Sequence, residues 1–403
     1  MVELISKDSF ATLLLCSYVT PLEKIVNNYK PFTQKEWINL STKIVKTEIA
    51  RPSNLFKKSV NDIIEQLRIT NEEADRIITL LARGPSMAIE VEKLSSMGIW
   101  IITRADKLYP KRFKKVLKSL SPTIIYGAGD INILETESIG IVGSRNANQN
   151  AIEFTKKLSK KAVSESFTVV SGGSKGIDSF AHQTAIENGG KTIAILSDGL
   201  SKFIKKKENL NNILNKQLVA ISPYHPNARF YSYTALERNK FIYGLSEFTV
   251  ATSSDFKKGG TWSGAVENLK MNWVPLYVRE DKDSKGLSEL ENMGAKKLTI
   301  NDFKETMLRS LLALEPTFKE EEIQNCTDIY TLAWPLIDKY LNKPIRIEKL
   351  CEILDIELIQ LNVWLKKANS EGKVNYLDIE TVVSSVFYNP DMDKAKQLNI
   401  FEQ

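Results

Sequence analysis

The sequence predicts an α/β protein built on an extended Rossmann-like, doubly wound parallel sheet, with a helical domain before it and a winged-helix domain after it. Apolar runs of four to six residues alternate with amphipathic stretches through the middle of the chain, whereas both ends show the spacing of buried helix faces. The 403 residues exceed what one hydrophobic core usually holds. We therefore predict domains at residues 1–100, 101–300 and 321–403, with a linker at 301–320.

The N-terminal domain is expected to be a SAM-like or helix-hairpin-helix-like module, or a helical cap that only packs on the core. Thr70 and Glu73 have the spacing of a capping box. A buried helix stripe follows at Ala74, Ile77, Ile78 and Leu81. Gly84 and Pro85 should end this helix, because both residues disfavour its continuation.

The middle domain is expected to hold the sheet. Its strands should lie at Ile139–Val142, Phe167–Val170, Thr192–Leu196, Leu218–Ile221, Phe248–Ala251 and Val274–Val278. Continuous β-rich runs indicate strands that are buried on both faces, which is typical of parallel sheets covered by helices. In such sheets ligands bind at the carboxyl ends of the strands.

The C-terminal domain is expected to contain three helices and a wing. The helices should lie at Asp328–Leu341, from Pro344 onward, and from Leu358 to about Gly372. The segment Lys373–Leu377 could form the β-wing of a winged helix. Such domains bind DNA or serve as protein contacts. The third helix carries Lys366 and Lys367 but no basic stripe, so both roles stay open.

Charge and composition limit the partners. A formal charge of +6 permits a polyanionic partner without requiring one. Nothing in the chain is apolar and long enough to span a bilayer, and the N-terminus lacks the pattern of a signal peptide. The cysteines and histidines are few and scattered, at Cys16, Cys326, Cys351, His182 and His225. We therefore expect a cytoplasmic protein with no metal, no cofactor and no membrane partner.

The first candidate binding segment is Gly143-Ser144-Arg145, at the end of a predicted strand. Gly143 would let a ligand approach the backbone closely. Ser144 can donate a hydrogen bond to an anion, and the Arg145 guanidinium offers a fork of donors that suits phosphate. The alternative is a plain strand-to-helix turn with an exposed arginine.

A glycine-rich turn follows the next strand. Its candidate phosphate-binding residues are Ser171, Gly172, Gly173, Lys175 and Gly176. A helix should begin near Asp178, so that backbone N–H groups and the helix dipole would favour an anion there. The pattern is neither a Walker motif nor G-x-G-x-x-G. We interpret Asp178 as a helix cap, and His182 as a packing or capping residue, rather than as catalytic groups.

Two further segments carry cations. The first comprises Arg238, Asn239 and Lys240. It should lie near a helix start, before an apolar stripe. The second comprises Lys257, Lys258, Gly259, Gly260 and Thr261. It follows another strand and opens a helix, so its glycines and threonine could cradle a phosphate. Trp262 could stack on a base or belong to the core.

Loops that follow parallel strands meet at one edge of the sheet. The candidate residues should therefore form a basic pocket with an aromatic wall, fit for a phosphodiester or a nucleotide. Lys202 and the run Lys205–Lys207 could extend this pocket or could form a solvated face.

At these residues the chain resembles the DprA/Smf family. The shared segments, in order, are Tyr109-Pro110, 141–145, 170–178, Ala181-His182, 189–192, 238–240, 244–246, 260–265 and 293–295. They cover about half of the chain. The chain departs from the family pattern at Phe203–Lys207, where the family has a tyrosine-proline motif. It also has Lys240 in place of an arginine, and 259–262 in place of a Ser-Gly-Ser segment, which suggests a divergent branch.

The resemblance implies a protein that binds single-stranded DNA and has no enzymatic activity. Its basic pocket would include Arg145, Lys175, Arg238 and Lys240. Family members dimerise and help to load the recombinase RecA during transformation. The resemblance therefore implies a homodimer that protects single-stranded DNA or hands it to a RecA-like recombinase.

Two alternatives stay open. DprA-like proteins also occur in phage-defence cassettes, so the chain could be an antitoxin or a sensor that restrains a cognate toxin. The Gly-Gly-Thr segment followed by Glu267 also resembles the nucleotide phosphoribohydrolases of the LOG family, although residues 262–264 alter the spacing. Release of free base from a nucleoside monophosphate would identify such an enzyme.

Overall fold

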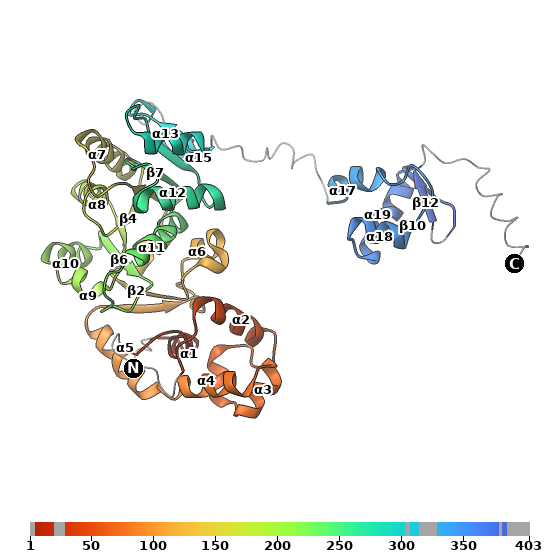
Figure 1. Ribbon diagram of the computed structural model, residues 1–403, viewed down its shortest axis with the longest axis horizontal. Coiled ribbons are helices and arrows are strands. Elements are labelled where there is room, and N and C mark those ends of the chain that lie inside the picture. Colours follow the sequence, from red (N-terminus) through yellow and green to blue (C-terminus); the bar gives the residue numbers. More distant parts are fainter. Residues whose placement is uncertain (1–4, 20–28, 303–306, 314–328, 379–380, 385–403) are drawn as a thin grey trace, which may run out of the picture. The chain divides into compact units, whose positions relative to one another are not determined.

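The computed structural model describes residues 5–19, 29–302, 307–313, 329–378 and 381–384. Two compact units divide the chain, Met1–Glu315 and Pro316–Gln403 (Figure 1). Within the described ranges, no helix is long and apolar enough to cross a membrane. Nor do those ranges hold a group of three or more His, Cys, Asp or Glu side chains that could bind a metal ion. Cys16 and Cys351 are free thiols, and Cys326 lies outside the described residues.

Nine strands form one sheet in the first unit. They are β1 (Trp100–Thr103), β2 (Ile124–Ala128), β3 (Ser138–Val142), β4 (Thr168–Gly172), β5 (Thr192–Ile195), β6 (Leu218–Ser222), β7 (Phe248–Ala251), β8 (Leu276–Arg279) and β9 (Lys296–Leu298). Their order in space is β1-β2-β6-β5-β4-β3-β7-β8-β9. From β6 to β9 neighbouring strands are parallel, whereas β2 is antiparallel to both β1 and β6. The predicted parallel core is confirmed, and the sequence prediction missed β1, β2 and β9, which extend it.

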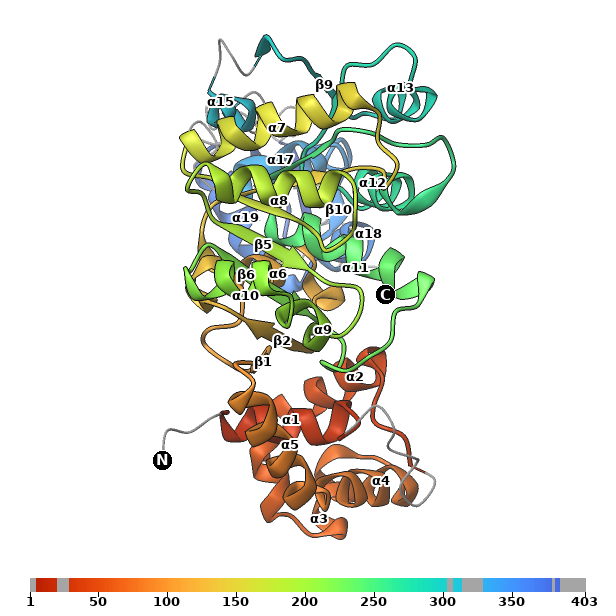
Figure 2. The same ribbon diagram turned by 90° about the vertical axis from the view of Figure 1, so that its left-hand side faces the viewer.

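Helices cover both faces of this sheet (Figures 1 and 2), and for this reason its core strands are buried along their whole length. Along β3, Ile139 and Ile141 join one hydrophobic cluster and Val142 joins another, as the alternation of side chains in a strand requires. The first face carries α7 (Gln149–Ser164), α8 (Ile177–Glu187) and α15 (Leu308–Ala313). The second carries α6 (Lys111–Val116), α11 (Ser232–Leu245), α12 (Gly259–Met271) and α13 (Lys285–Asn292). Two short helices, α9 (Leu200–Ile204) and α10 (Lys207–Leu214), join β5 to β6.

Five α-helices precede the sheet. They are α1 (Lys7–Cys16), α2 (Gln34–Val45), α3 (Val60–Leu67), α4 (Asn71–Leu81) and α5 (Gly84–Ser96). The predicted capping box is confirmed, because Thr70 Oγ1 accepts a hydrogen bond from the Glu73 N–H at 3.2 Å while the Glu73 carboxylate accepts one from the Thr70 N–H. One prediction was wrong here: Gly84 and Pro85 begin α5 instead of ending α4. A proline lacks an N–H that the first turn of a helix leaves unused anyway.

These helices do not form a separate core. They share one hydrophobic cluster with the sheet, which reaches Tyr126 of β2, Ala194 of β5 and Ala220 of β6. Figure 1 shows them gathered at the β1–β2 end of the sheet. The domain boundary near residue 100 stays a prediction, as do the other domain limits.

The second unit has the arrangement of a winged helix. Its helices are α17 (Ile329–Asp338), α18 (Ile347–Leu354) and α19 (Leu358–Ser370). Its strands are β10 (Ile345–Arg346), β11 (Val374–Tyr376) and β12 (Thr381–Ser384), in the antiparallel order β10-β12-β11. Leu350, Leu361 and Leu365 are buried in the cluster that joins the helices to this sheet. The predicted first helix was to begin at Asp328, which lies outside the described residues.

Candidate nucleic-acid interface

A cavity of about 520 Å³ opens at the carboxyl ends of β3, β4 and β7, and we name it the strand-end cavity. The order of the strands explains its position. From β3 the chain adds β4, β5 and β6 on one side, and it then returns to place β7 on the other side of β3. Loops that leave β3 and β7 diverge at this switch point, which is where doubly wound sheets bind their ligands.

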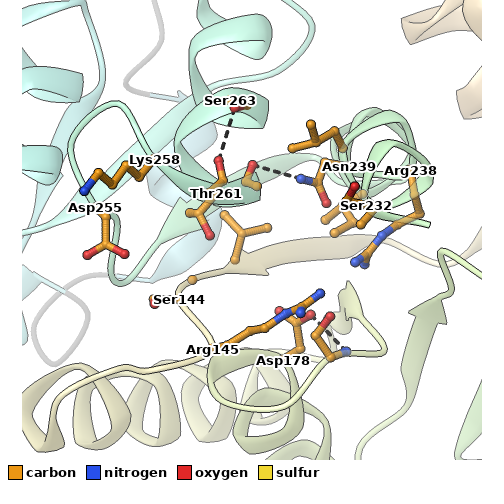
Figure 3. A pocket seen from close by; sticks show the side chains of 18 of the residues that line it. Ser144, Arg145, Asp178, Ser232, Arg238, Asn239, Asp255, Lys258, Thr261 and Ser263 are labelled. Atoms are coloured by element: carbon orange, nitrogen blue, oxygen red, sulfur yellow. Dashed lines mark hydrogen bonds between the residues drawn. The ribbon is translucent and has the colours of Figure 1, made fainter. Parts of the chain in front are cut away.

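Four segments surround the strand-end cavity (Figure 3): the loop after β3, the loop after β4, α11 and the start of α12. The predicted site residues that line it are Gly143, Ser144, Arg145, Arg238, Asn239, Lys258, Gly259, Gly260 and Thr261. Those that do not line it are Ser171, Gly172, Gly173, Lys175, Gly176, Lys240, Lys257 and Trp262. The structure therefore brings together about half of the predicted set.

The loop after β3 presents Arg145 to the cavity. The side chain is exposed, and among the described residues it has no ion-pair partner. Its guanidinium lies over the ring of Phe230, with Cζ 5.7 Å from the ring centroid. The neighbouring Ser144 is held in place because its N–H donates to the Ser253 hydroxyl at 2.8 Å. An uncompensated guanidinium at the mouth of a cavity can bind a phosphate with two parallel hydrogen bonds.

Sequence reasoning missed Phe230, which supplies the aromatic wall of the cavity. Phe230 lies just before α11, lines the cavity and is 47% exposed. An exposed ring next to a cation suits the face of an unstacked base. The signal available in the sequence was the run of aromatic residues Phe230, Tyr231 and Tyr233. Tyr231 and Tyr233 are themselves exposed and stack on each other, with ring centroids 5.5 Å apart.

Several of the glycines serve packing rather than close approach of a ligand. An added Cβ at Gly143 would lie 2.4 Å from Ile177 Cγ1, and one at Gly172 would lie 1.9 Å from Arg238 Nη1. Gly176 has a φ of +81° and caps the start of α8. The predicted role of Gly143 was therefore wrong, because the protein itself fills the space that the glycine leaves open.

The turn after β4 does not form the predicted phosphate cradle. Ser171 and Gly172 are buried, and the Ser171 hydroxyl donates to the Ile141 carbonyl at 2.6 Å. Gly173 and Lys175 are exposed, but they line a second cavity beside the first. Buried groups that are already hydrogen-bonded have no donor left for a phosphate, so this turn shapes the floor of the strand-end cavity instead.

Asp178 and Arg238 are buried side chains of opposite charge at that floor, and both line the strand-end cavity. Arg238 is 4% exposed, and its Nη1 donates to the Ile195 carbonyl at 2.8 Å. Asp178 is 7% exposed and accepts hydrogen bonds from the Ser174 N–H at 3.2 Å and the Ser171 hydroxyl at 3.1 Å. Two predictions were wrong here. Arg238 lies in the middle of α11 rather than near its start, and the cap of α8 is Gly176 rather than Asp178.

Burial shifts the pKa values of Asp178, Arg238 and His182. It raises the pKa of the Asp178 carboxyl, against the opposing charge of Arg238. It lowers the pKa of the Arg238 guanidinium and that of His182. His182 is a packing residue, as predicted, because its Nε2 is hydrogen-bonded to the Gly172 carbonyl at 2.8 Å and its Nδ1 contacts the Thr192 hydroxyl. Their hydrogen bonds hold the turn in shape, and Asp178 and Arg238 also line the strand-end cavity.

The other two polar residues of this α11 segment differ in their surroundings. Asn239 lines the cavity, and its Nδ2 donates to the Gly260 carbonyl at 2.8 Å, which fixes the start of α12. Lys240 is directed away from the cavity. Its Nζ is 3.6 Å from Glu237 Oε1 and 5.2 Å from the ring centroid of Phe241. The prediction that Lys240 lies in the pocket was therefore wrong.

The start of α12 has the features of a helix N-terminus that attracts anions. Lys258 is the N-cap residue of this 13-residue helix, and no side chain caps the helix. Its first N–H groups therefore lack intrahelical partners, and the helix dipole adds positive potential. Gly259 has a φ of +79°, a conformation that favours glycine. The Lys258 side chain is exposed and, like Arg145, forms no ion pair among the described residues, while the Asp255 carboxylate lines the same cavity.

Trp262 lies on the side of α12 that faces the protein interior. It packs edge-on against Phe256, with ring centroids 5.2 Å apart, and against the hydrophobic cluster of the second sheet face. Lys257 lies over the same Phe256 ring, at 5.1 Å. Trp262 is not among the residues that line the strand-end cavity, and its contacts with Phe256 and the hydrophobic cluster agree with the alternative that places it in the core.

Comparisons with known proteins agree with this fold. Residues 100–308, just over half of the chain, match the family described as DNA recombination-mediator protein A. The DNA processing protein DprA of Streptococcus pneumoniae is 28% identical over 213 residues, which are 52% of this chain and 73% of that relative. The DNA processing protein DprA of Bacillus subtilis is 29% identical over 165 residues, which are 40% of this chain and 54% of that relative.

A solved structure supports the fold. The X-ray structure of DNA processing protein A from Streptococcus pneumoniae is similar with a TM-score of 0.51 at 21% identity. The similarity covers 68% of this chain and 98% of that one.

Proposed function

The chain belongs to the DNA recombination-mediator protein A family, and we propose that it binds single-stranded DNA in the strand-end cavity without turning over a substrate. One observation carries the proposal: groups suited to a phosphate and a ring suited to a base surround the same cavity. Arg145, Lys258 and the open start of α12 provide the first, and Phe230 provides the second.

The position of these groups favours a single strand over a duplex. The cavity lies at the ends of strands, between loops, and Phe230 is one of the residues that line it. A single strand can place a phosphate at Arg145 and turn an unstacked base onto Phe230. A duplex keeps its bases stacked inside, so it would contact the cations at the rim and leave the aromatic ring unused.

Catalysis is not part of the proposal. The acid–base groups nearest the cavity floor, Asp178 and His182, are hydrogen-bonded within the protein. Glu267, which the hydrolase alternative needs, is exposed and does not line the strand-end cavity. No observation favours that hydrolase or the antitoxin role, and we do not develop either.

Family membership extends the proposal to partners. We propose that the chain acts in the cytoplasm, that it protects single-stranded DNA or hands it to a RecA-like recombinase, and that it forms a homodimer through its first unit. Light scattering at micromolar concentration tests the last point. A mass near twice 45.6 kDa is expected, and a constant mass of 45.6 kDa would contradict the dimer.

A binding titration tests the central proposal. Fluorescence anisotropy would compare a labelled oligothymidylate, a duplex of equal length and a mononucleotide at several salt concentrations. We expect the single strand to bind most tightly, with an affinity that falls steeply with salt because cation contacts release counterions. Lys258→Ala should weaken binding, whereas Lys240→Ala, which removes the same charge from a residue outside the cavity, should not. Equal affinity for the duplex would contradict the proposal.

A further inference from the structure

We propose that a second cavity, beside the first, binds the next nucleotides of the same strand, so that the natural ligand is an oligonucleotide rather than a nucleotide. We name this second cavity the α9 groove. It has a volume of about 590 Å³ and lies between α9 and the loops after β3 and β4. The inference rests on the proposed function, and it adds a second binding site of defined residues and a minimum ligand length.

The two cavities are adjacent and share part of their lining. Arg145, Ser174 and Phe230 line both of them, so a strand that leaves the strand-end cavity past Phe230 enters the α9 groove without crossing a wall of other residues. A backbone bound at Arg145 therefore has a path in which its next phosphates meet new partners.

Those partners are cations without counter-charges. Lys175 comes from the loop after β4, Lys202 from α9 and Lys206 from the N-cap of α10, and all three line the groove. They are exposed, and in the described part of the chain none of them has an ion-pair partner. The carboxylate among the lining residues is Asp198. Three lysines facing one carboxylate leave a clear positive excess, which suits consecutive phosphates.

The groove also offers a surface for a base. Phe203 of α9 lines it opposite the bare backbone of Gly173, where an added Cβ would lie 3.7 Å from Phe203 Cε2. The ring is partly exposed and otherwise packs against the hydrophobic cluster, so its exposed part could contact a base. Cations and a ring thus recur in the α9 groove in the same combination as in the strand-end cavity.

Backbone hydrogen bonds fix the loop that carries Phe230, which lies between the two cavities. The Gly199 N–H donates to the Ala228 carbonyl at 3.1 Å, and the Ser201 N–H donates to the Pro226 carbonyl at 2.9 Å. Gly199 allows this contact because an added Cβ would lie 2.1 Å from the Pro226 oxygen. The loop that carries Phe230 is therefore fastened to α9, and the ring stands between the cavities as a fixed divider.

The chain supplies a matched control. Lys205 and Lys207 belong to the same lysine run and are as exposed as Lys202 and Lys206, but they do not line the groove. If the run acts only as a diffuse positive surface, removing either pair of charges has the same effect. If the groove is a binding site, only the pair Lys202 and Lys206 matters.

The experiment compares wild type with Lys202→Ala/Lys206→Ala and with Lys205→Ala/Lys207→Ala. Affinity would be measured by competition with thymidine mononucleotide, dinucleotide, tetranucleotide and longer oligothymidylates. We expect the groove variant to bind the longer ligands at least about tenfold more weakly while keeping its affinity for the shortest ones. The slope of log K against log salt should flatten by about 1.4, for two lost single-strand phosphate contacts. The control variant should behave as wild type.

The outcomes separate the two proposals. Equal losses in both variants, or no loss in either, would overturn the α9 groove while wild-type binding still supports the strand-end cavity. A loss that is the same for every ligand length would also overturn it. If the wild-type chain binds none of the oligothymidylates, the proposed function fails and the inference fails with it. Matching thermal unfolding of all three proteins would show that the exposed lysines act on binding rather than on the fold.

Discussion

The strand-end cavity and the third helix of the second unit were both candidates for nucleic-acid contact, and they differ in how their charges are arranged. Around the cavity, Arg145 and Lys258 form no ion pair among the described residues and line a concave surface. On α19 the most exposed side chains include Ile359, which is 81% exposed, and Val363, which is 57% exposed. One region presents cations to a hollow, and the other presents apolar side chains to solvent.

Some of the described lysines of the second unit have partners within it. Lys373 Nζ lies 2.6 Å from the Glu371 carboxylate, and Lys349 Nζ lies 2.8 Å from the Glu352 carboxylate. Lys367 lies over the ring of Tyr330 at 4.5 Å. The comparison teaches that the number of cations in a region is a weak guide to nucleic-acid binding. What matters is whether the cations are unpaired and whether they converge on one cavity.

The largest effect is expected at Arg238, and it should appear in stability. Arg238→Ala removes a buried guanidinium, its hydrogen bond to the Ile195 carbonyl, and the positive charge that opposes the rise of the Asp178 pKa. We expect the first unit to lose about 1.5–3 kcal/mol of unfolding free energy, the scale of a lost hydrogen bond to a charged group. Urea unfolding measures this. A variant as stable as wild type would show that Arg238 is not structural.

Arg145→Ala removes the second arginine that lines the strand-end cavity. In contrast to Arg238, we expect Arg145 to affect binding and not stability. Loss of a charge-assisted contact to phosphate should weaken single-strand binding by about 1.5–3 kcal/mol. Arg145→Lys should recover only part, because lysine lacks the fork of donors. The melting temperature should barely change, since the side chain is exposed. A large drop in melting temperature with intact binding would reverse the assigned roles of Arg145 and Arg238.

A pH titration should separate the two units. Both histidines, His182 and His225, belong to the first unit, and burial lowers the pKa of each. The unfolded chain takes up protons near pH 6.5 where the folded unit resists them, so stability is lost as the pH falls below about 6.5. We expect the first unit to lose roughly 1 kcal/mol between pH 7.5 and pH 6. The second unit has no histidine and serves as an internal control in calorimetry, and a parallel loss there would contradict this reading.

The smallest effect is expected on α19. Lys366→Ala/Lys367→Ala removes as much charge as the α9-groove variant, but from a helix whose exposed face is largely apolar. Single-strand affinity should stay within about 0.5 kcal/mol of wild type. A loss comparable to that of Arg145→Ala would mean that the second unit takes part in DNA binding.

The sheet could be predicted because buried parallel strands leave a continuous local signal. The runs at Ile139–Val142 and Phe248–Ala251 contain apolar residues throughout, and they are strands with almost the same limits. The capping box at Thr70 is a local signal of the same kind. The strands that were missed are β1 and β9 at the two edges of the sheet and β2 beside β1.

The site could be predicted only to the level of its segments. The sequence does not show whether the space beside a glycine is filled by a ligand or by a side chain of the protein. The groups that approach Gly143 and Gly172 come from other elements, so local sequence could not reveal them. The burial of Arg238 depends in the same way on how α11 lies against the sheet. Phe230 was missed, and Trp262 does not line the cavity, because packing sets the direction of a ring and spacing along the chain does not encode it.

The most direct test asks which residues touch the bound strand. An oligothymidylate with single 5-iodouracil substitutions would be irradiated with the full-length protein, and mass spectrometry would identify the aromatic residues that form adducts. The account predicts adducts at Phe230 from one position and at Phe203 from a neighbouring one, with none on residues 329–384. Adducts confined to 329–384, or an adduct at Trp262 in place of Phe230, would contradict the claim that the strand lies in the strand-end cavity.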